Sequence, residues 1–142
     1  MVYATELDFT NSYGLSELVM LTNPDDSAAQ TVNSDAFDNA EVLMSARIDG
    51  YLRAGGYALP LAEVPATLTQ LAVDMIRYHL NARNPSEDAR DRYRDAIRYL
   101  EQLSKGQVDV GLSSTGAAIA QPSAVGYVKR TPIFSDQALE GF

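Results

Sequence analysis

Residues 48–61, IDGYLRAGGYALPL, contain the feature that decides the fold: an apolar helix-forming segment runs into two adjacent glycines, Gly55 and Gly56. Such a pair could belong to a phosphate-binding loop, but that loop needs its glycines before a helix and a Lys-Ser/Thr pair that is missing here. At a helix end, either glycine can take the left-handed conformation that caps the last carbonyl groups. Pro60 then keeps the chain extended. Together with Tyr57, these residues predict a rigid connector between two helices.

Three long helices are predicted around and after this connector, over residues 35–54, 65–82 and about 84–105. In each of them apolar residues recur at three- and four-residue steps, which gives the helix one apolar face. These residues are Phe37, Ala40, Met44, Ile48, Tyr51 and Leu52 in the first helix, Leu68, Leu71, Ala72, Met75, Ile76, His79 and Leu80 in the second, and Ala89, Tyr93, Ala96, Ile97, Leu100 and Leu103 in the third.

Cap signals set the expected ends of the long helices. Ser34 is expected to cap the first helix, and Pro65 suits the first turn of the second. The third is expected to begin at NPSE (84–87), with Asn84 as the cap, Pro85 in the first turn and Glu87 completing a capping box, and to end at Gly106. Its outer face is expected to carry Asp–Arg pairs at helical spacing. These pairs are Asp88–Arg92, Asp91–Arg94 and Asp95–Arg98.

Shorter elements complete the predicted body. Thr5 can cap a short helix that ends at Gly14, and LSELVMLT (15–22) predicts another, before a polar loop. QVDVGL alternates apolar and polar residues, which predicts a short strand near 107–112. The expected fold class is all-α: a small bundle with three long helices in residues 1–112, followed by an extended C-terminal arm over 113–142.

The arm differs from the body in composition. Its first part, SSTGAAIAQPSAVG, is small and polar and is not expected to fold alone, whereas the last residues regain bulk. An extended stem that ends in apolar anchors is typical of a segment that docks on a partner chain. A terminus with incidental hydrophobic residues, or a tail folded back on its own core, are the alternatives. The predicted docking residues are Tyr127, Lys129, Arg130, Ile133, Phe134, Leu139 and Phe142.

Composition excludes several classes of function. The net charge is −8, and because the arm carries two basic and two acidic residues, the whole of it lies in residues 1–112. An acidic body repels phosphate, which argues against a groove-reading DNA-binding protein, although DNA could slide past such a surface. No apolar run approaches the roughly 20 residues that span a bilayer, and the acidic N-terminus does not resemble a signal peptide, so we expect a soluble protein.

No constellation for catalysis or metal binding is recognisable. The chain has no cysteine, and His79 is its single histidine, so a zinc site or a catalytic triad lacks partners. We expect His79 to be a hydrogen-bonded residue of the core or of an interface. The acidic loop after Asn23 lacks the central glycine of a calcium loop, and Ser34 stands where such a loop has its last glutamate. We therefore expect no enzyme activity, no metal and no cofactor.

A resemblance to a known family spans nearly the whole chain. Four stretches carry it through their order and spacing: YATELDF…YGLSELVMLT (3–22), ARIDGYLRAGGYALPLAEVPATLTQLAVDMIRYHL (46–80), RYRDAIRYLEQLSKGQVDVGL (92–112) and FSDQALEGF (134–142). In these stretches the chain resembles the Mu-like prophage family of small helical phage proteins, which are similar to head–tail connector (adaptor) proteins of long-tailed phages.

The resemblance implies a helical protein of the virion neck, assembled in the host cytoplasm as a ring below the portal protein. The ring is expected to be a dodecamer that matches the portal, to let DNA pass without specific binding, and to offer a platform for the next neck or tail protein. In similar adaptors the C-terminal arm reaches the portal or a neighbouring subunit. The alternatives are another neck or tail-completion protein, or a small helical regulator that binds a partner protein or DNA.

Overall fold

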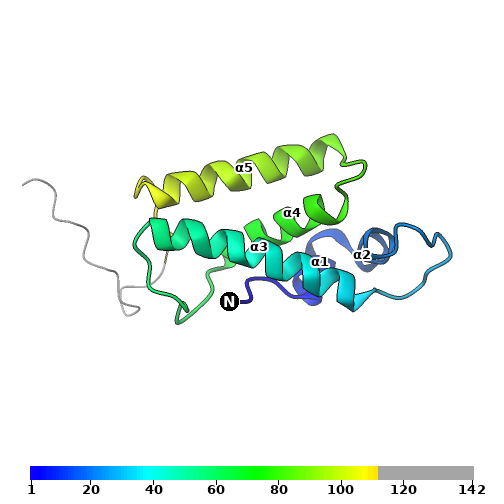
Figure 1. The fold of residues 1–142 in the computed structure, drawn as a ribbon. Coiled ribbons are helices and arrows are strands. Elements are labelled where there is room, and N and C mark those ends of the chain that lie inside the picture. The colour runs from blue at the N-terminus through cyan, green and yellow to red at the C-terminus, as the bar shows by residue number, and fades with distance from the viewer. Residues whose placement is uncertain (112–142) are drawn as a thin grey trace, which may run out of the picture.

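The computed structural model describes residues 1–111, which form five helices and no strand (Figure 1). The helices are α1 (Glu6–Tyr13), α2 (Leu15–Thr22), α3 (Ser34–Ala54), α4 (Ala66–Leu80) and α5 (Glu87–Ser104). The predicted all-α class is confirmed. The strand predicted near 107–112 is wrong over 107–111, because Val108 and Val110 pack one side of an irregular segment against the helices, and Val110 is only 3% exposed.

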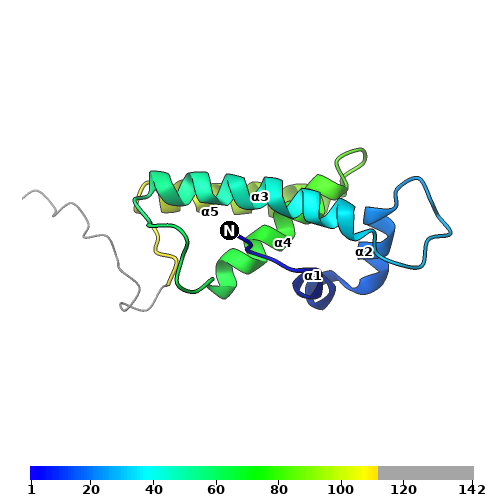
Figure 2. The ribbon, with the colours of Figure 1, turned by 60° about the horizontal axis from the view of Figure 1, so that its bottom comes forward.

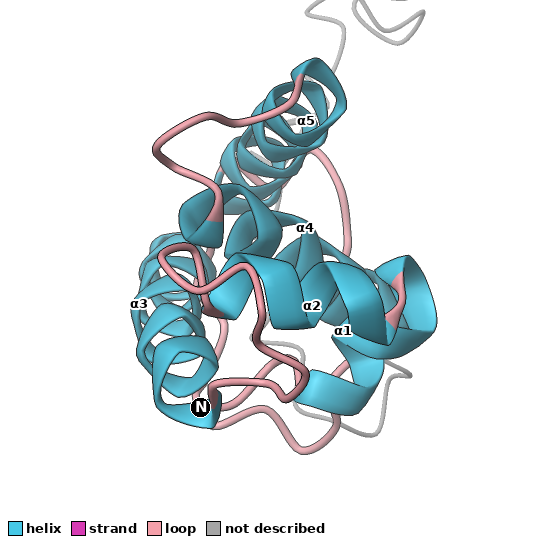
Figure 3. Ribbon diagram, turned by 90° about the vertical axis from the view of Figure 1, so that its right-hand side faces the viewer, coloured by secondary structure: helices cyan, strands magenta, loops and turns pink. Residues whose placement is uncertain are grey.

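Helix α4 is the centre of the molecule. It contacts each of the other four helices, and Figure 3 shows it surrounded by α3, α5 and the α1–α2 pair. α3 and α5 also contact one another, so α3, α4 and α5 form a three-helix bundle. α1 and α2 form a helical hairpin that covers the end of the bundle where α3 begins (Figure 2).

The core is built from the predicted apolar faces. Most residues of the three stripes are buried, and the half-buried Tyr51, Leu71, Leu80, Tyr93 and Ile97 pack against the same cluster. α1 and α2 add Phe9, Leu18 and Leu21, and the ring of Phe9 meets that of Phe37 edge-on at 6.3 Å. Of the two places expected for His79, the core is wrong, because its side chain is exposed in the last turn of α4, whereas the neighbouring Leu80 packs against the core.

Two of the predicted helix caps are confirmed. The Thr5 hydroxyl accepts a hydrogen bond from the amide of Asp8 at 3.3 Å, and the Asp8 carboxylate accepts one from the amide of Thr5 at 2.8 Å, which completes a capping box. α5 ends as predicted at Gly106, whose φ is 69°.

Other predicted helix starts are wrong by one or two residues. Asn33 caps α3 in place of Ser34, Pro65 stands at the cap position before α4, and Ser86 caps α5 in place of Asn84. The capping box expected at Glu87 is therefore absent from α5. At α3 and at α5 two cap-forming residues lie close together in the sequence, so residue type alone does not select between them.

Candidate functional site

The connector after α3 contains the glycine pair singled out in the sequence. Gly56 has a φ of 85°, its amide donates to the Arg53 carbonyl at 3.0 Å, and the Tyr57 amide donates to the Leu52 carbonyl at 2.9 Å. These two hydrogen bonds form a Schellman motif, which satisfies the last carbonyls of the helix. Gly55 has a right-handed φ of −78°, so the left-handed position belongs to Gly56.

Gly55 has a different role, which is to permit close packing. A Cβ atom at this position would lie 3.0 Å from the Leu103 carbonyl oxygen and 3.2 Å from the Tyr57 ring. The end of α3 therefore lies against the end of α5, and Tyr57 is half-buried there, where burial raises the pKa of its phenol. Pro60 lies apart from this contact, exposed and after a cis peptide bond.

The segment before α1 is fixed to α3 by a buried polar network that the sequence patterns did not reveal. The Tyr3 hydroxyl donates to Asp49 Oδ1 at 2.6 Å, and the Tyr3 amide donates to Glu41 Oε1 at 3.2 Å. Ser45 also donates to Glu41. Burial and the hydrogen bond to Asp49 raise the pKa of the Tyr3 phenol above its ordinary value. The one available signal was the spacing of Glu41, Ser45 and Asp49 by four residues along one side of α3.

A second polar cluster joins the α1–α2 hairpin to the bundle. The Arg77 guanidinium contacts Glu17 at 2.5 Å and Asp88 at 2.6 Å, and it lies 4.1 Å from the centre of the Tyr13 ring. The Tyr13 hydroxyl donates to Asp74 at 2.5 Å. Burial, followed by this hydrogen bond, raises the pKa of Tyr13 to about 12. The cluster links α1, α2, α4 and α5, and so fixes the orientation of the hairpin.

The outer face of α5 carries the ion pairs expected there. Arg92 contacts Asp88 at 3.0 Å, and the pairs Asp91–Arg94 and Asp95–Arg98 are 3.2 and 3.5 Å apart. Hydrogen bonds from Arg77 and Arg92 lower the pKa of the Asp88 carboxyl below its ordinary value. Exposed pairs of this kind contribute little to stability, so their main effect is on surface charge.

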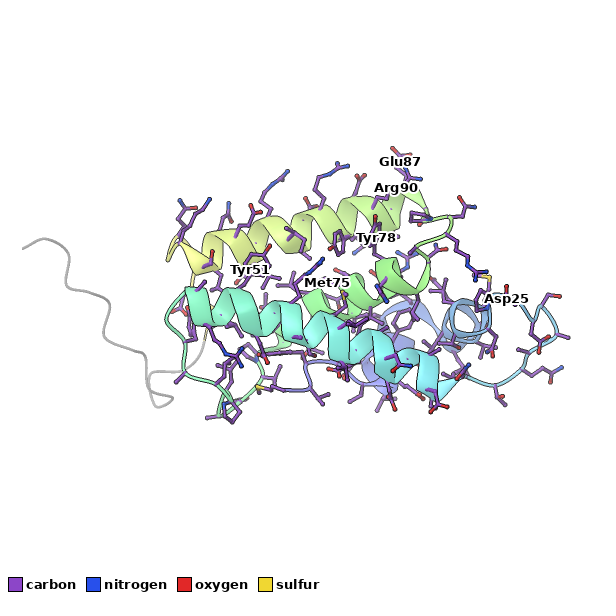
Figure 4. The ribbon with its side chains drawn as sticks, viewed as in Figure 1. Asp25, Tyr51, Met75, Tyr78, Glu87 and Arg90 are labelled. Carbon is purple, nitrogen blue, oxygen red and sulfur yellow. The ribbon has the colours of Figure 1, made fainter. Side chains whose placement is uncertain are left out.

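A hollow of about 410 Å³ lies between α4 and α5. Tyr78 stacks on Tyr93 there, with ring centres 4.2 Å apart, and Figure 4 shows Tyr78 between the two helices with Arg90 above it. Arg94 and Arg98 also line the hollow, but each is paired with an aspartate of its own helix. Arg90 lines the hollow as well, with a hydrogen bond to the Pro85 carbonyl at 3.1 Å, and Glu101 adds a negative charge to the lining.

Large apolar side chains remain exposed on α1, α2 and α3. Val42 and Leu43 are 63% and 53% exposed on the side of α3 that faces away from the core, and Leu7, Leu15 and Met20 are between 55% and 67% exposed. Gly50 lies on the same outer side of α3, where an added Cβ would meet nothing within 4 Å. Exposed apolar surface of this kind is typical of contact with other chains.

A groove of about 870 Å³ lies at the hairpin end of the molecule, between α2, the loop after it and the end of α4. Met20 lines it from α2, Leu80 lines it from α4, and the exposed His79 lies at its edge. The Asn23 side chain donates to the carbonyls of Val19 and Thr31, both at 2.9 Å, and so holds the loop against the helix. His79 is thus a surface residue of this groove.

The predicted docking arm lies outside the described residues, and so do all of its candidate side chains. Within residues 1–111 no group of three or more His, Cys, Asp or Glu side chains is arranged to hold a metal ion. No helix in this part of the chain is long and apolar enough to cross a membrane.

Comparison with known proteins identifies the family. The family described as "Bacteriophage Mu, Gp36" matches residues 3–128, which include all five helices and the first part of the arm. The chain belongs to this family. The resemblance to Mu-like phage proteins seen in the sequence is therefore confirmed.

Two relatives in this family are similar over most of their length. "Gene product J" of Escherichia phage Mu is 34% identical over 149 aligned positions, which cover 100% of this chain and 99% of the relative. "Mu-like prophage FluMu protein gp36" of Haemophilus influenzae is 30% identical over 114 positions, 80% of each chain. This chain is accordingly a phage protein.

Proposed function

We propose that this phage protein is a structural, non-enzymatic head–tail connector (adaptor) subunit of the virion neck. It forms a ring below the portal protein, extends the DNA channel and joins head to tail. The observation that carries the proposal is the apolar surface that α1, α2 and α3 leave exposed, led by Val42 and Leu43 on α3. A small phage protein with such surface is suited to assembly with other chains. The four stretches resemble the Mu-like family, whose members are similar to connector proteins, and this supports the neck as the place of assembly.

A closed ring requires that two different faces of each subunit meet. The outer face of α3 and the α1–α2 hairpin lie on different sides of α4 (Figure 3), and both expose apolar side chains. Apolar area on two sides supports a heterologous contact that repeats around an axis. We propose a dodecamer, which matches the symmetry expected of the portal.

The acidic body supports the passage of DNA through the ring. The net charge of −8 lies wholly in residues 1–112. DNA is repelled by such a surface, so it slides through the channel without being retained. No cofactor or metal takes part in this role.

The arm is proposed to strengthen the assembly. Ile133, Phe134, Leu139 and Phe142 supply apolar anchors, and Lys129 and Arg130 supply positive charge for an acidic rim. Each anchor can contribute roughly 1.5–3 kcal/mol when fully buried, but fixing the backbone costs about 1–2 kcal/mol per residue. Docking is therefore weak for one subunit and strong for a ring that binds through many arms at once.

The test is deletion of the gene from a Mu-like prophage followed by electron microscopy of the lysate. We expect DNA-filled heads and separate tails, and complete particles when the gene is restored. Cryo-electron microscopy of complete particles should then locate the protein between portal and tail. Complete particles without the protein, or its location elsewhere in the tail, would exclude the connector role.

A matched pair of variants tests whether the apolar face takes part. Leu43→Asp places a charge on the outer side of α3, and Gln30→Asp places the same charge at an exposed polar position in the loop before it. Both variants should keep the melting temperature of the parent protein. Only Leu43→Asp should fail to restore complete particles.

A further inference from the structure

The groove at the hairpin end has the chemistry of a peptide-binding surface. Val19, Met20 and Leu21 line it from α2, and of these Met20 is 63% exposed, whereas Val19 and Leu21 are 9% and 7% exposed. Methionine is flexible and polarizable, so it adapts to apolar side chains of different shape. The groove can therefore accept the aromatic and aliphatic side chains of an extended segment.

The walls of the groove are held in place by hydrogen bonds within the loop after α2. In addition to the two bonds from the Asn23 side chain, the Thr22 hydroxyl accepts a bond from the Asn33 amide at 3.1 Å, which ties the far end of the loop to α2. Asp26 Oδ1 accepts a bond from the Ala28 amide at 3.0 Å. A site that is formed before binding loses less entropy when a ligand binds.

Charges along the groove complement those of the C-terminal segment. Asp26 lines the groove, and Arg83 lines it on the α4 side, paired with Asp25 at 2.9 Å across an exposed contact. In the sequence, Lys129 and Arg130 precede the apolar anchors, and Asp136 and Glu140 lie among them. The basic start of this segment fits the carboxylate of Asp26, whereas Arg83 is already paired with Asp25.

The groove and the start of the arm lie at opposite ends of the molecule. Figure 1 shows the end of α5 at one end of the bundle and α2 at the other. Helix α3, which has 21 residues, extends from one of these ends to the other. At about 1.5 Å per residue, α3 spans about 30 Å. Because the arm starts at one end and the groove lies at the other, each copy can insert its arm into the groove of one neighbour and bind the arm of another neighbour in its own groove.

We propose that this groove is the receptor for the C-terminal arm, residues 127–142, of a second copy of the chain. The proposal deepens the proposed ring and rests on it, because it names the surface through which neighbouring subunits are joined. The fifteen or so residues between the described body and Tyr127 span up to about 50 Å when extended, enough to reach an adjacent subunit.

Cysteine cross-linking tests this contact directly, because the chain has no cysteine of its own. Full-length Met20→Cys and full-length Phe134→Cys, each with a tag of different mass, are mixed and mildly oxidised. We expect a disulfide-linked dimer with one copy of each variant. The control mixture replaces Met20→Cys by Asp95→Cys, whose side chain is 72% exposed on α5 outside the groove, and should give far less of the mixed dimer.

Three outcomes would overturn the proposal. Equal cross-linking of the Met20 and Asp95 variants would show random collision. No cross-link at Met20 would show that the arm docks elsewhere. A cross-link confined within single chains of the double variant Met20→Cys/Phe134→Cys, with none in the mixture, would show that the arm occupies the groove of its own subunit.

The result is separable from the test of the connector role. If the Met20 cross-link is absent but the protein is found in the neck of the particle, the groove proposal fails and the connector role stands. If the mixed dimer forms but phage particles are complete without the protein, the connector role fails and the groove contact stands. In a second assay, native mass spectrometry of ring assembly, Met20→Glu should weaken assembly. Gln30→Glu adds the same charge at an exposed polar position and should leave assembly intact.

Discussion

Gly50, Gly55 and Gly56 lie within seven residues of one another, and a side chain at each position would meet a different environment. Gly56 has a φ of 85°, which disfavours any residue with a Cβ. Gly55 has an ordinary φ, but an added Cβ would lie 3.0 Å from the Leu103 carbonyl oxygen. At Gly50, in the middle of α3, the same atom would meet nothing within 4 Å.

Alanine at each of the three positions should separate these causes. Gly56→Ala should lower the free energy of unfolding by about 1–2 kcal/mol through backbone strain. Gly55→Ala should lower it by about 1–3 kcal/mol, because α3 and α5 must move apart. Gly50→Ala should raise it by about 0.5–1 kcal/mol, since alanine favours the helix. Urea unfolding checks all three, and equal effects at 50 and 56 would contradict the assigned conformations.

Asp88 provides a prediction of pH dependence at the residue scale. Arg77 and Arg92 lower the pKa of its carboxyl below the ordinary value of 3.8. A group with a lowered pKa in the folded state stabilises the protein at pH values above its unfolded pKa, and this stabilisation is lost as the pH falls through the folded pKa. Asp88→Asn should therefore lower the melting temperature at pH 7 but have little effect below the lowered pKa.

The control for Asp88 is Asp91→Asn, which removes another exposed carboxylate of α5 that contacts a single arginine. Asp88 contacts two arginines, and one of them is Arg77 of α4, which joins the α1–α2 hairpin to the bundle. The control should change the melting temperature less at neutral pH. If the difference in melting temperature between Asp88→Asn and the parent protein stayed constant from pH 7 down to pH values below the lowered pKa, the assigned ion pairs would be contradicted.

At the scale of helices, the sequence predicted the buried face of each long helix more accurately than the residue at which the helix begins. Apolar residues that recur every three or four positions lie on one side of a helix whatever it packs against, so the buried faces of α3, α4 and α5 were predictable. The starts of α3 and α5 were not, because Asn33 and Ser34, or Asn84 and Ser86, are similar caps. The strand near 107 was wrong because an irregular segment that packs one side on helices alternates in the same way as a strand.

The buried polar residues of α3 were the main feature of the helices that the sequence did not predict. Glu41, Ser45 and Asp49 are each less than 10% exposed, although carboxylates on a helix are usually solvated. Their partner Tyr3 is 46 residues away from Asp49 in the sequence. No local pattern reports such a distant hydrogen bond, so α3 appeared to have one buried stripe where it also has a buried polar side.

Tyr3→Phe tests how strongly the N-terminal segment is fixed to α3. The substitution keeps the buried ring but removes the hydroxyl that donates to Asp49, and a buried acceptor that loses its donor costs about 1–3 kcal/mol of stability. Tyr99→Phe is the matched control, because its hydroxyl donates to the Asp109 carbonyl at 3.1 Å in an exposed position. The control should change stability by less than about 0.5 kcal/mol. Equal losses in chemical unfolding would show that the Tyr3–Asp49 bond has no special weight.

At the scale of the whole molecule, the groove could not be predicted from the sequence. It forms where α2, the following loop and the end of α4 meet, and residues that line it, such as Met20 and Arg83, are more than 60 positions apart in the chain. His79 shows the same limit, since it continues the apolar stripe of α4 but lies at the groove edge. The net charge, in contrast, follows from the amino-acid composition alone and does not depend on the fold.

The charge of the molecule leads to a prediction about DNA. With a net charge of −8, the protein should not retain linear double-stranded DNA in a gel-shift assay at physiological salt. Arg94 and Arg98 on the outer face of α5 do not change this expectation, because Asp91 and Asp95 neutralise them. Asp91→Asn/Asp95→Asn, which leaves both arginines without these partners, should bind DNA more strongly than the parent at low salt and lose that binding as salt is added. A salt-sensitive shift by the parent protein itself would favour a DNA-binding regulator over a channel that DNA passes without adhering.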